Sequence, residues 1–222
     1  MSSTSGAGLY ACFCNNARGT HAVSATPSTM LELGTTLPSF RLWDLNGKPM
    51  SSDDVAGKNG LVVAFICQHC PFVRHIRHEF AKAAQDFQQR GVAVVAINSN
   101  DVETNPEAGP EGMKEEAATV GYTFPYLYDD TQEVAKAFRA ACTPDFFLFD
   151  GQRRLVYRGQ FDDSRPNSGK PVTGRDLIGA VDALLAGKAI ASDQRPSIGC
   201  NIKWKKGAEP AYLAGGLQTG GH

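Results

Sequence analysis

The sequence predicts an α/β domain in which helices flank a central mixed β-sheet. Residues 61–66 (LVVAFI) and 92–98 (VAVVAIN) are short apolar runs rich in β-branched residues, as in strands buried on both faces. Between them, residues 72–88 place apolar side chains three or four positions apart, which indicates a helix with one buried face. This β-α-β unit implies parallel strands with a right-handed crossover. Residues 145–150 and 154–161, joined by a tight turn, predict an antiparallel hairpin. The sheet is therefore expected to be mixed.

The first element of the chain is predicted to be another hairpin. Apolar and polar residues alternate through Phe40 and Leu42, and Asn46-Gly47 follows as a strong turn signal. After the β-α-β unit, a loop rich in Asn, Pro and Gly precedes an expected helix over residues 110–120.

The second half of the chain supplies the remaining elements. Residues 122–130 predict a short strand and turn, and residues 131–140 a short helix with Thr131 as its N-cap. A closing amphipathic helix over residues 173–188 has Thr173 as its expected cap. This order of elements has the connectivity of a thioredoxin-type fold.

We divide the chain into three parts. Residues 1–30 lack Asp and Glu and show no apolar periodicity, so we expect a flexible N-terminal extension. Residues 31–190 form the expected domain, and residues 191–222 a C-terminal tail that contains the segment PSIGCNIKWK. The extension has no apolar block of the kind a secretory signal needs. We expect a cytoplasmic protein, with organelle targeting by residues 1–30 as the alternative.

Composition narrows the classes of partner. The 222 residues carry 22 basic and 23 acidic side chains, a formal net charge of -1. A nearly neutral chain has no field to attract nucleic acid or an anionic membrane. No apolar run approaches the roughly 20 residues of a bilayer-spanning helix. We therefore expect neither nucleic acid nor a membrane as a partner.

Two cysteines stand at the seam between the strand at 61–66 and the helix that follows. Cys67 and Cys70 form a Cys-x-x-Cys motif, and His69 lies between them. A thiol becomes a nucleophile only as the thiolate, and the unpaired amides and dipole of a helix N-terminus favour that anion. We expect the helix start to activate Cys67, a protonated His69 to assist it, and Cys70 to be its redox partner.

Two other interpretations of these cysteines remain open. A structural zinc site needs two further ligands at suitable spacing, and Cys142 and Cys200 are single. Free cysteines are also often buried and inert. The sequence predicts no metal and no cofactor.

A second feature is the Thr143-Pro144 pair directly before the strand at 145–150. Proline cannot donate to a sheet ladder, so this position indicates a special turn with a cis peptide, or else the start of an edge strand.

Together, the segments FICQHCPF, AINSND, FPYLYDDTQEVAKAF, TPDFFLFD and PSIGCNIKWK resemble the peroxiredoxin-like thioredoxin-fold proteins, the redoxin group of the AhpC/TSA type. The resemblance extends over roughly residues 31–206. It implies a thioredoxin-like (redoxin) domain in which Thr143 and Pro144 dock the substrate beside the Cys-x-x-Cys turn. It also makes Cys142 a candidate auxiliary thiol. Cys200, within the segment PSIGCNIKWK, is a further candidate auxiliary thiol, with a resolving role as one alternative.

The sequence departs from the peroxiredoxin pattern at three positions. Cys70-Pro71 matches the cysteine and proline of peroxiredoxins, but Cys67 replaces the threonine that orients the peroxide. Val63 and Pro144 stand where a proline and an arginine are expected. The sequence thus has a peroxiredoxin frame with a thioredoxin active site.

We therefore predict an antioxidant thiol–disulfide oxidoreductase. Cys67 attacks a substrate disulfide, Cys70 resolves the mixed disulfide, and an external reductant such as a thioredoxin or glutathione system restores the dithiol. The substrate is a disulfide-bearing protein, a small thiol or a peroxide. One alternative is a thiol peroxidase that uses Cys70 and is resolved by Cys67 or Cys142. The other is a non-enzymatic metal-binding or redox-sensing thiol protein.

Overall fold

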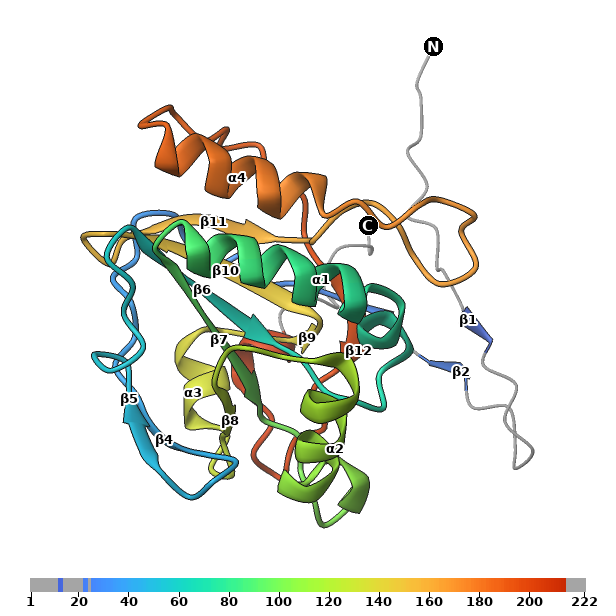
Figure 1. The fold of residues 1–222 in the computed structure, drawn as a ribbon. Helices are drawn as coiled ribbons and strands as arrows, with labels where there is room; N and C mark the ends of the chain where they lie inside the picture. The colour runs from blue at the N-terminus through green and yellow to red at the C-terminus, as the bar shows by residue number, and fades with distance from the viewer. Residues whose placement is uncertain (1–11, 14–21, 24, 215–222) are drawn as a thin grey trace.

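A seven-stranded mixed sheet forms the centre of the molecule (Figure 1). The computed structural model describes residues 12–13, 22–23 and 25–214. In spatial order the strands are β11 (Leu155–Gly159), β10 (Asp145–Asp150), β6 (Gly60–Phe65), β7 (Val92–Asn98), β8 (Tyr126–Tyr128), β4 (Arg41–Asp44) and β5 (Pro49–Ser51). β6, β7 and β8 run parallel, and the other neighbours pair antiparallel. Both predicted hairpins and the β-α-β unit are confirmed.

Helices cover both faces of this sheet. They are α1 (Pro71–Gln89), α2 (Pro110–Val120), α3 (Glu133–Ala137), α4 (Arg175–Leu185) and α5 (Ala211–Ala214), with a short 3-10 helix η1 (Pro106–Ala108) before α2. Figure 1 shows α1 and α4 side by side across one face of the sheet, with α3 on the other. A hydrophobic core lies on each face of the sheet. Successive residues of a strand point into opposite cores: Val62 packs with α1 and α4, and Val63 with α3.

A second, three-stranded sheet joins distant parts of the chain. β12 (Ile198–Asn201) pairs antiparallel with both β3 (Ala25–Pro27) and β9 (Cys142–Thr143). The short strands β1 (Cys12–Phe13) and β2 (Ala22–Val23) pair with each other.

Residues on both sides of the predicted domain, 31–190, contact it in the structure. The end of the proposed extension belongs to the fold, because β3 pairs with β12 and the amide of Ser28 donates to the carbonyl oxygen of Ser197. Most of residues 1–24 lie outside the described part. The proposed tail is also part of the domain at least as far as Trp204, which packs against the α3 core. Residues 215–222 lie outside the description.

Two predicted helix caps also differ. α3 starts at Glu133 rather than at residue 131, and the carboxylate of Asp129 accepts the amide of Ala135 at 2.9 Å. α4 starts at Arg175, and the carboxylate of Asp162 accepts the amide of Gly174 at 2.7 Å. In both places a carboxylate from an earlier segment accepts an amide at the helix start, beside a longer, 3.4 Å contact from the amide of Glu133 to the Thr131 hydroxyl and from that of Arg175 to the Thr173 hydroxyl.

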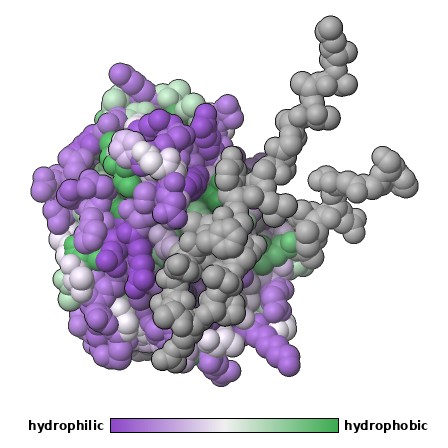
Figure 2. Space-filling view, turned by 90° about the vertical axis from the view of Figure 1, so that its right-hand side faces the viewer, coloured by the Kyte–Doolittle hydropathy of each residue, from purple (hydrophilic) through white to green (hydrophobic). Residues whose placement is uncertain are grey.

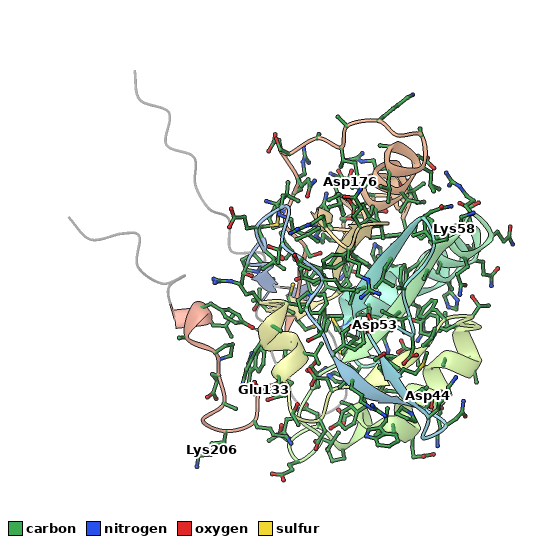
Figure 3. The ribbon with its side chains drawn as sticks, turned by 90° about the vertical axis from the view of Figure 1, so that its left-hand side faces the viewer. Asp44, Asp53, Lys58, Glu133, Asp176 and Lys206 are labelled. Carbon is green, nitrogen blue, oxygen red and sulfur yellow. The ribbon has the colours of Figure 1, made fainter. Side chains whose placement is uncertain are left out.

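The face of the molecule in Figure 2 is largely polar. Hydrophilic residues dominate the face shown in Figure 2 outside the area that grey atoms cover. The charged residues labelled in Figure 3 are spread over separate elements and form no single-sign patch. Among the residues that the structure describes, no helix is both long enough and apolar enough to cross a bilayer.

Candidate active site

The Cys-x-x-Cys turn connects β6 to α1. β6 ends at Phe65 and α1 begins at Pro71, the first helical position, where the ring costs no hydrogen bond. The amide of Cys70 donates to the carbonyl oxygen of Cys67 at 3.3 Å, which closes the turn. The motif thus lies at the strand-to-helix seam, as predicted.

The loop before β10 lies against this turn. The Thr143–Pro144 peptide bond is cis, as the sequence indicated. The hydroxyl oxygen of Thr143 is 3.4 Å from Cys67 Sγ, and its carbonyl oxygen is 3.1 Å from Cys70 Sγ. One residue of this loop therefore contacts both cysteines of the motif.

The structure adds Cys200 to this group. In the β9–β12 ladder Cys200 is the register partner of Thr143, and its sulfur lies 2.9 Å from Cys70 Sγ. The sequence made Cys200 a candidate auxiliary and resolving thiol, but it gave no signal that this residue, 130 positions away, would touch Cys70.

All three of these thiols are buried. Cys67 is 1% exposed, Cys70 0% and Cys200 6%. The resemblance assigned Thr143 to substrate docking. In the structure the backbone of Thr143 is already paired with β12. A substrate therefore reaches the sulfurs only after a local opening of the segments that cover them.

The surroundings of the two thiols favour Cys70, rather than the expected Cys67, as the thiolate. Cys70, and not Cys67, is the N-cap of α1. Burial opposes a charge on its sulfur, but hydrogen bonds from Cys200, Cys67 and Thr143, together with the amide of Val73, outweigh burial and place the pKa of Cys70 well below its usual value. The helix start thus stabilises the anion three residues later than the sequence suggested.

Cys67 has the opposite character. Burial, followed by its interaction with the Cys70 sulfur, raises the pKa of Cys67 well above its usual value. The hydroxyl of Thr143 acts against this rise. When Cys70 is charged, Cys67 is therefore the neutral thiol of the pair.

His69 does not supply the expected positive charge. Its Nε2 lies 3.7 Å from Cys67 Sγ, and its buried Nδ1 has no hydrogen-bond partner within the described part of the chain. Burial lowers the pKa of His69, so the ring is mainly neutral near pH 7. It lines the turn without acting as a cation beside the sulfur.

Cys142 lies near the site, but its sulfur points elsewhere. Neighbouring residues of a strand face opposite sides. Thr143 faces the dithiol, whereas Cys142 Sγ lies 3.8 Å from the carbonyl oxygen of Pro144. Burial raises the pKa of Cys142 well above its usual value. Cys142 is therefore a buried thiol whose sulfur contacts the backbone of Pro144.

A buried polar network behind the turn was missed by sequence reasoning. The hydroxyl of Tyr126 lies 3.2 Å from the carbonyl oxygen of Ile66, directly before Cys67, and 3.4 Å from the carboxylate of Glu116. Burial raises the pKa of Glu116 to about 7. In the sequence Glu116 is one of several polar residues of α2, and nothing marks it as buried. Only the packing of α2 against β8 shows that it differs from the others.

No group of three or more His, Cys, Asp or Glu residues suited to a metal ion occurs within the part of the chain that the structure describes.

A dithiol at the start of α1, facing a cis-proline loop at the end of a mixed sheet, defines a redoxin, an oxidoreductase of the thioredoxin-fold class. The chain belongs to the AhpC/TSA family, which matches residues 33–158.

The chain is similar to several known proteins and solved structures. An uncharacterised conserved protein from Geobacillus kaustophilus has a crystal structure with a TM-score of 0.81 and 54% identity, covering 83% of this chain and 98% of that one. A thioredoxin domain of a thiol-disulfide oxidoreductase from Bacteroides vulgatus shares the fold with a TM-score of 0.55 at 18% identity, covering 70% of this chain and 99% of that one. The thiol-disulfide oxidoreductase ResA of Geobacillus thermodenitrificans is 28% identical over 125 residues, which are 56% of this chain and 67% of that protein.

Proposed function

We propose that this redoxin catalyses thiol–disulfide exchange with Cys67 and Cys70 as its redox dithiol. The observation that carries the proposal is the contact of Thr143 with both sulfurs, at 3.4 Å and 3.1 Å, at the start of α1. The cis-proline loop fixes the two sulfurs relative to each other, and the helix start supplies the amide that favours a thiolate.

The electrostatics support Cys70 as the attacking group. Its thiolate attacks one sulfur of a substrate disulfide, a mixed disulfide forms on Cys70, and the substrate's other sulfur leaves as a thiolate. The Cys67 thiol then loses its proton and attacks the Cys70 sulfur. This second step releases the second substrate thiol and leaves a Cys67–Cys70 disulfide. This order reverses the roles that the sequence suggested.

The cycle needs a donor of two electrons. The class of reaction implies thiol or disulfide substrates and a reductant. We further propose that a thioredoxin or glutathione system reduces the Cys67–Cys70 disulfide, in a reducing, cytoplasmic setting where thiols are kept reduced.

The test is a disulfide-reduction assay with insulin as substrate and dithiothreitol as donor. We expect Cys70→Ser to abolish turnover. The double variant Cys67→Ser/Cys200→Ser, which also removes the thiol in contact with Cys70, should accumulate substrate adducts on Cys70. Turnover by Cys70→Ser at the wild-type rate, or adducts found on Cys67 instead, would contradict the assignment.

A peroxidase function is the second candidate, because the stabilised thiolate is the cysteine that matches the peroxiredoxin position. Stopped-flow mixing with hydrogen peroxide separates the two functions. The exchange enzyme is expected to consume peroxide only at the slow rate of an ordinary thiol, since Pro144 stands where the peroxiredoxin pattern has its arginine. Rapid oxidation of Cys70 would favour the peroxidase.

A further inference from the structure

The sulfur of Cys200 lies directly against the sulfur of Cys70. The 2.9 Å between Cys70 Sγ and Cys200 Sγ compares with a covalent S–S bond of about 2.05 Å. Only a small side-chain movement separates this contact from a bond.

The backbone holds Cys200 in this place. Its strand β12 has a neighbour on each side: Cys200 is in register with Thr143 of β9 and with Ala25 of β3. Gly199 makes the close approach possible, because a Cβ at that position would lie 1.9 Å from the carbonyl oxygen of Thr143. The contact therefore depends on a strand that packs directly onto the cis-proline loop.

We propose that Cys200 is a second resolving thiol for Cys70, so that an adduct on Cys70 ends either as a Cys67–Cys70 or as a Cys70–Cys200 disulfide. This inference rests on the proposed function, since it requires an adduct on Cys70.

The step balances without an added oxidant. The substrate disulfide supplies the oxidising equivalents when it forms the Cys70 adduct. Cys200 gives up its thiol proton to water and attacks the Cys70 sulfur. The Cys70–Cys200 bond forms, the bond between Cys70 and the substrate sulfur breaks, and the substrate leaves as a thiolate. The same attack on a Cys67–Cys70 disulfide would release Cys67 as a thiol and move the disulfide to Cys70–Cys200.

The charge state of Cys70 controls when Cys200 can react. Its interaction with the Cys70 sulfur, followed by burial, raises the pKa of Cys200 far above its usual value. An adduct on Cys70 removes the thiolate and with it the first of these causes. Cys200 thus stays a thiol while Cys70 is free and becomes easier to ionise once Cys70 carries a substrate.

The Cys70–Cys200 product has a structural consequence. It ties β12 to the first residue before α1, across the edge of Thr143 that β12 already covers. The product leaves Cys67 reduced, which distinguishes it chemically from the ordinary oxidised dithiol.

Peptide mapping tests the proposal on the full chain. Glutathione disulfide is added to the reduced protein, the reaction is stopped with acid, free thiols are alkylated, and trypsin is added. Three tryptic peptides carry the relevant cysteines: residues 59–74 with Cys67 and Cys70, residues 189–203 with Cys200, and residues 140–153 with Cys142.

The decisive protein is Cys67→Ser, which leaves β12 and Cys200 untouched. We expect its 59–74 peptide to be cross-linked to 189–203, with little glutathione on Cys70. In Cys67→Ser/Cys200→Ser the glutathione adduct should persist on 59–74. The matched control Cys67→Ser/Cys142→Ser should cross-link 59–74 to 189–203 as Cys67→Ser does.

The outcomes separate this inference from the proposed function. Glutathione that persists on 59–74 of Cys67→Ser, with alkylated Cys200, overturns the role of Cys200 and leaves exchange by Cys67 and Cys70 intact. A wild-type 59–74 peptide that gains neither glutathione, nor an internal disulfide, nor a cross-link to another peptide overturns the proposed function. A cross-link from 59–74 to 140–153 would assign the second resolving role to Cys142 instead.

Discussion

The carbonyl oxygen of Thr143 lies 3.1 Å from Cys70 Sγ, on the residue whose hydroxyl also approaches Cys67. A protonated Cys70 can donate to this oxygen, whereas a thiolate must find its donors elsewhere, at the Val73 amide and the neighbouring hydroxyl and thiol groups. Thr143 thus has a contact for the protonated and for the charged form of Cys70. Which cysteine reacts first depends on which of the two loses its proton more easily.

The first prediction concerns the identity of the thiolate. Because the pKa of Cys70 is lowered and that of Cys67 raised, the thiolate absorbance at 240 nm should appear well below the usual cysteine pKa of about 8.5. Cys67→Ser should keep this early titration, and Cys70→Ser should lose it. An early titration that survives in Cys70→Ser but not in Cys67→Ser would return the activated role to Cys67.

The hydroxyl of Thr143 should affect the resolving step. It opposes the rise in the pKa of Cys67, so Thr143→Val is expected to make Cys67 harder to ionise. A hydrogen bond contributes about 0.5–1.5 kcal/mol, which corresponds to a roughly 2–10-fold slower conversion of the Cys70 adduct to the Cys67–Cys70 disulfide. The rate is measured in a Cys200→Ser background to remove the second route. Thr143→Ser keeps the hydroxyl and should stay near the starting rate; an equal loss in both variants would refute the role of the hydroxyl.

Among the glycines near the site, Gly199 should tolerate replacement by alanine least. Gly199→Ala places a Cβ against the carbonyl oxygen of Thr143, so β12 must shift from β9, at a cost of about 1–3 kcal/mol. Denaturant unfolding measures the cost, and the Cys70–Cys200 cross-link should be lost with it.

Gly179 provides the matched control. It is exposed within α4, and a Cβ there would meet nothing within 4 Å. Gly179→Ala is expected to stabilise the protein by up to about 1 kcal/mol, because alanine favours a helix over glycine. If Gly199→Ala were equally harmless, the close packing of β12 on the loop would be disproved.

Asp145 should make the stability depend on pH. This residue follows Pro144, is fully buried and accepts the Ser28 hydroxyl at 2.9 Å. Burial raises its pKa from 3.8 to about 7, so between these values the folded protein binds more protons than the unfolded chain. The free energy of unfolding should therefore fall as the pH rises from 3.8 to about 7, by about 4 kcal/mol in total for this group.

The check is a series of denaturant curves across that pH range. Asp145→Asn cannot ionise and should reduce the slope, while Glu116, whose pKa burial also raises to about 7, continues to contribute in both proteins. Parallel pH dependences of the wild type and Asp145→Asn would show that Asp145 does not titrate in this window.

Local patterns in the sequence determined much of the fold. The apolar runs of β6 and β7 and the spacing of α1 identify buried strands and a one-sided helix, because burial requires those residue types at those periods. The Cys-x-x-Cys pair and Thr143-Pro144 are likewise local signals. Both lie where the sequence predicted, at the start of α1 and before β10.

Only the tertiary structure decided which thiol carries the charge and which cysteine joins the pair. The apolar spacing located the start of α1 to within one residue, at 72 against Pro71, but only the path of the turn before it shows that Cys70, and not Cys67, is the N-cap beside the free amides. Cys200 reaches Cys70 through the pairing of β12 with β9, a contact between segments far apart in the sequence. Such pairing depends on how the packed elements meet in space, and no short stretch of the chain encodes it.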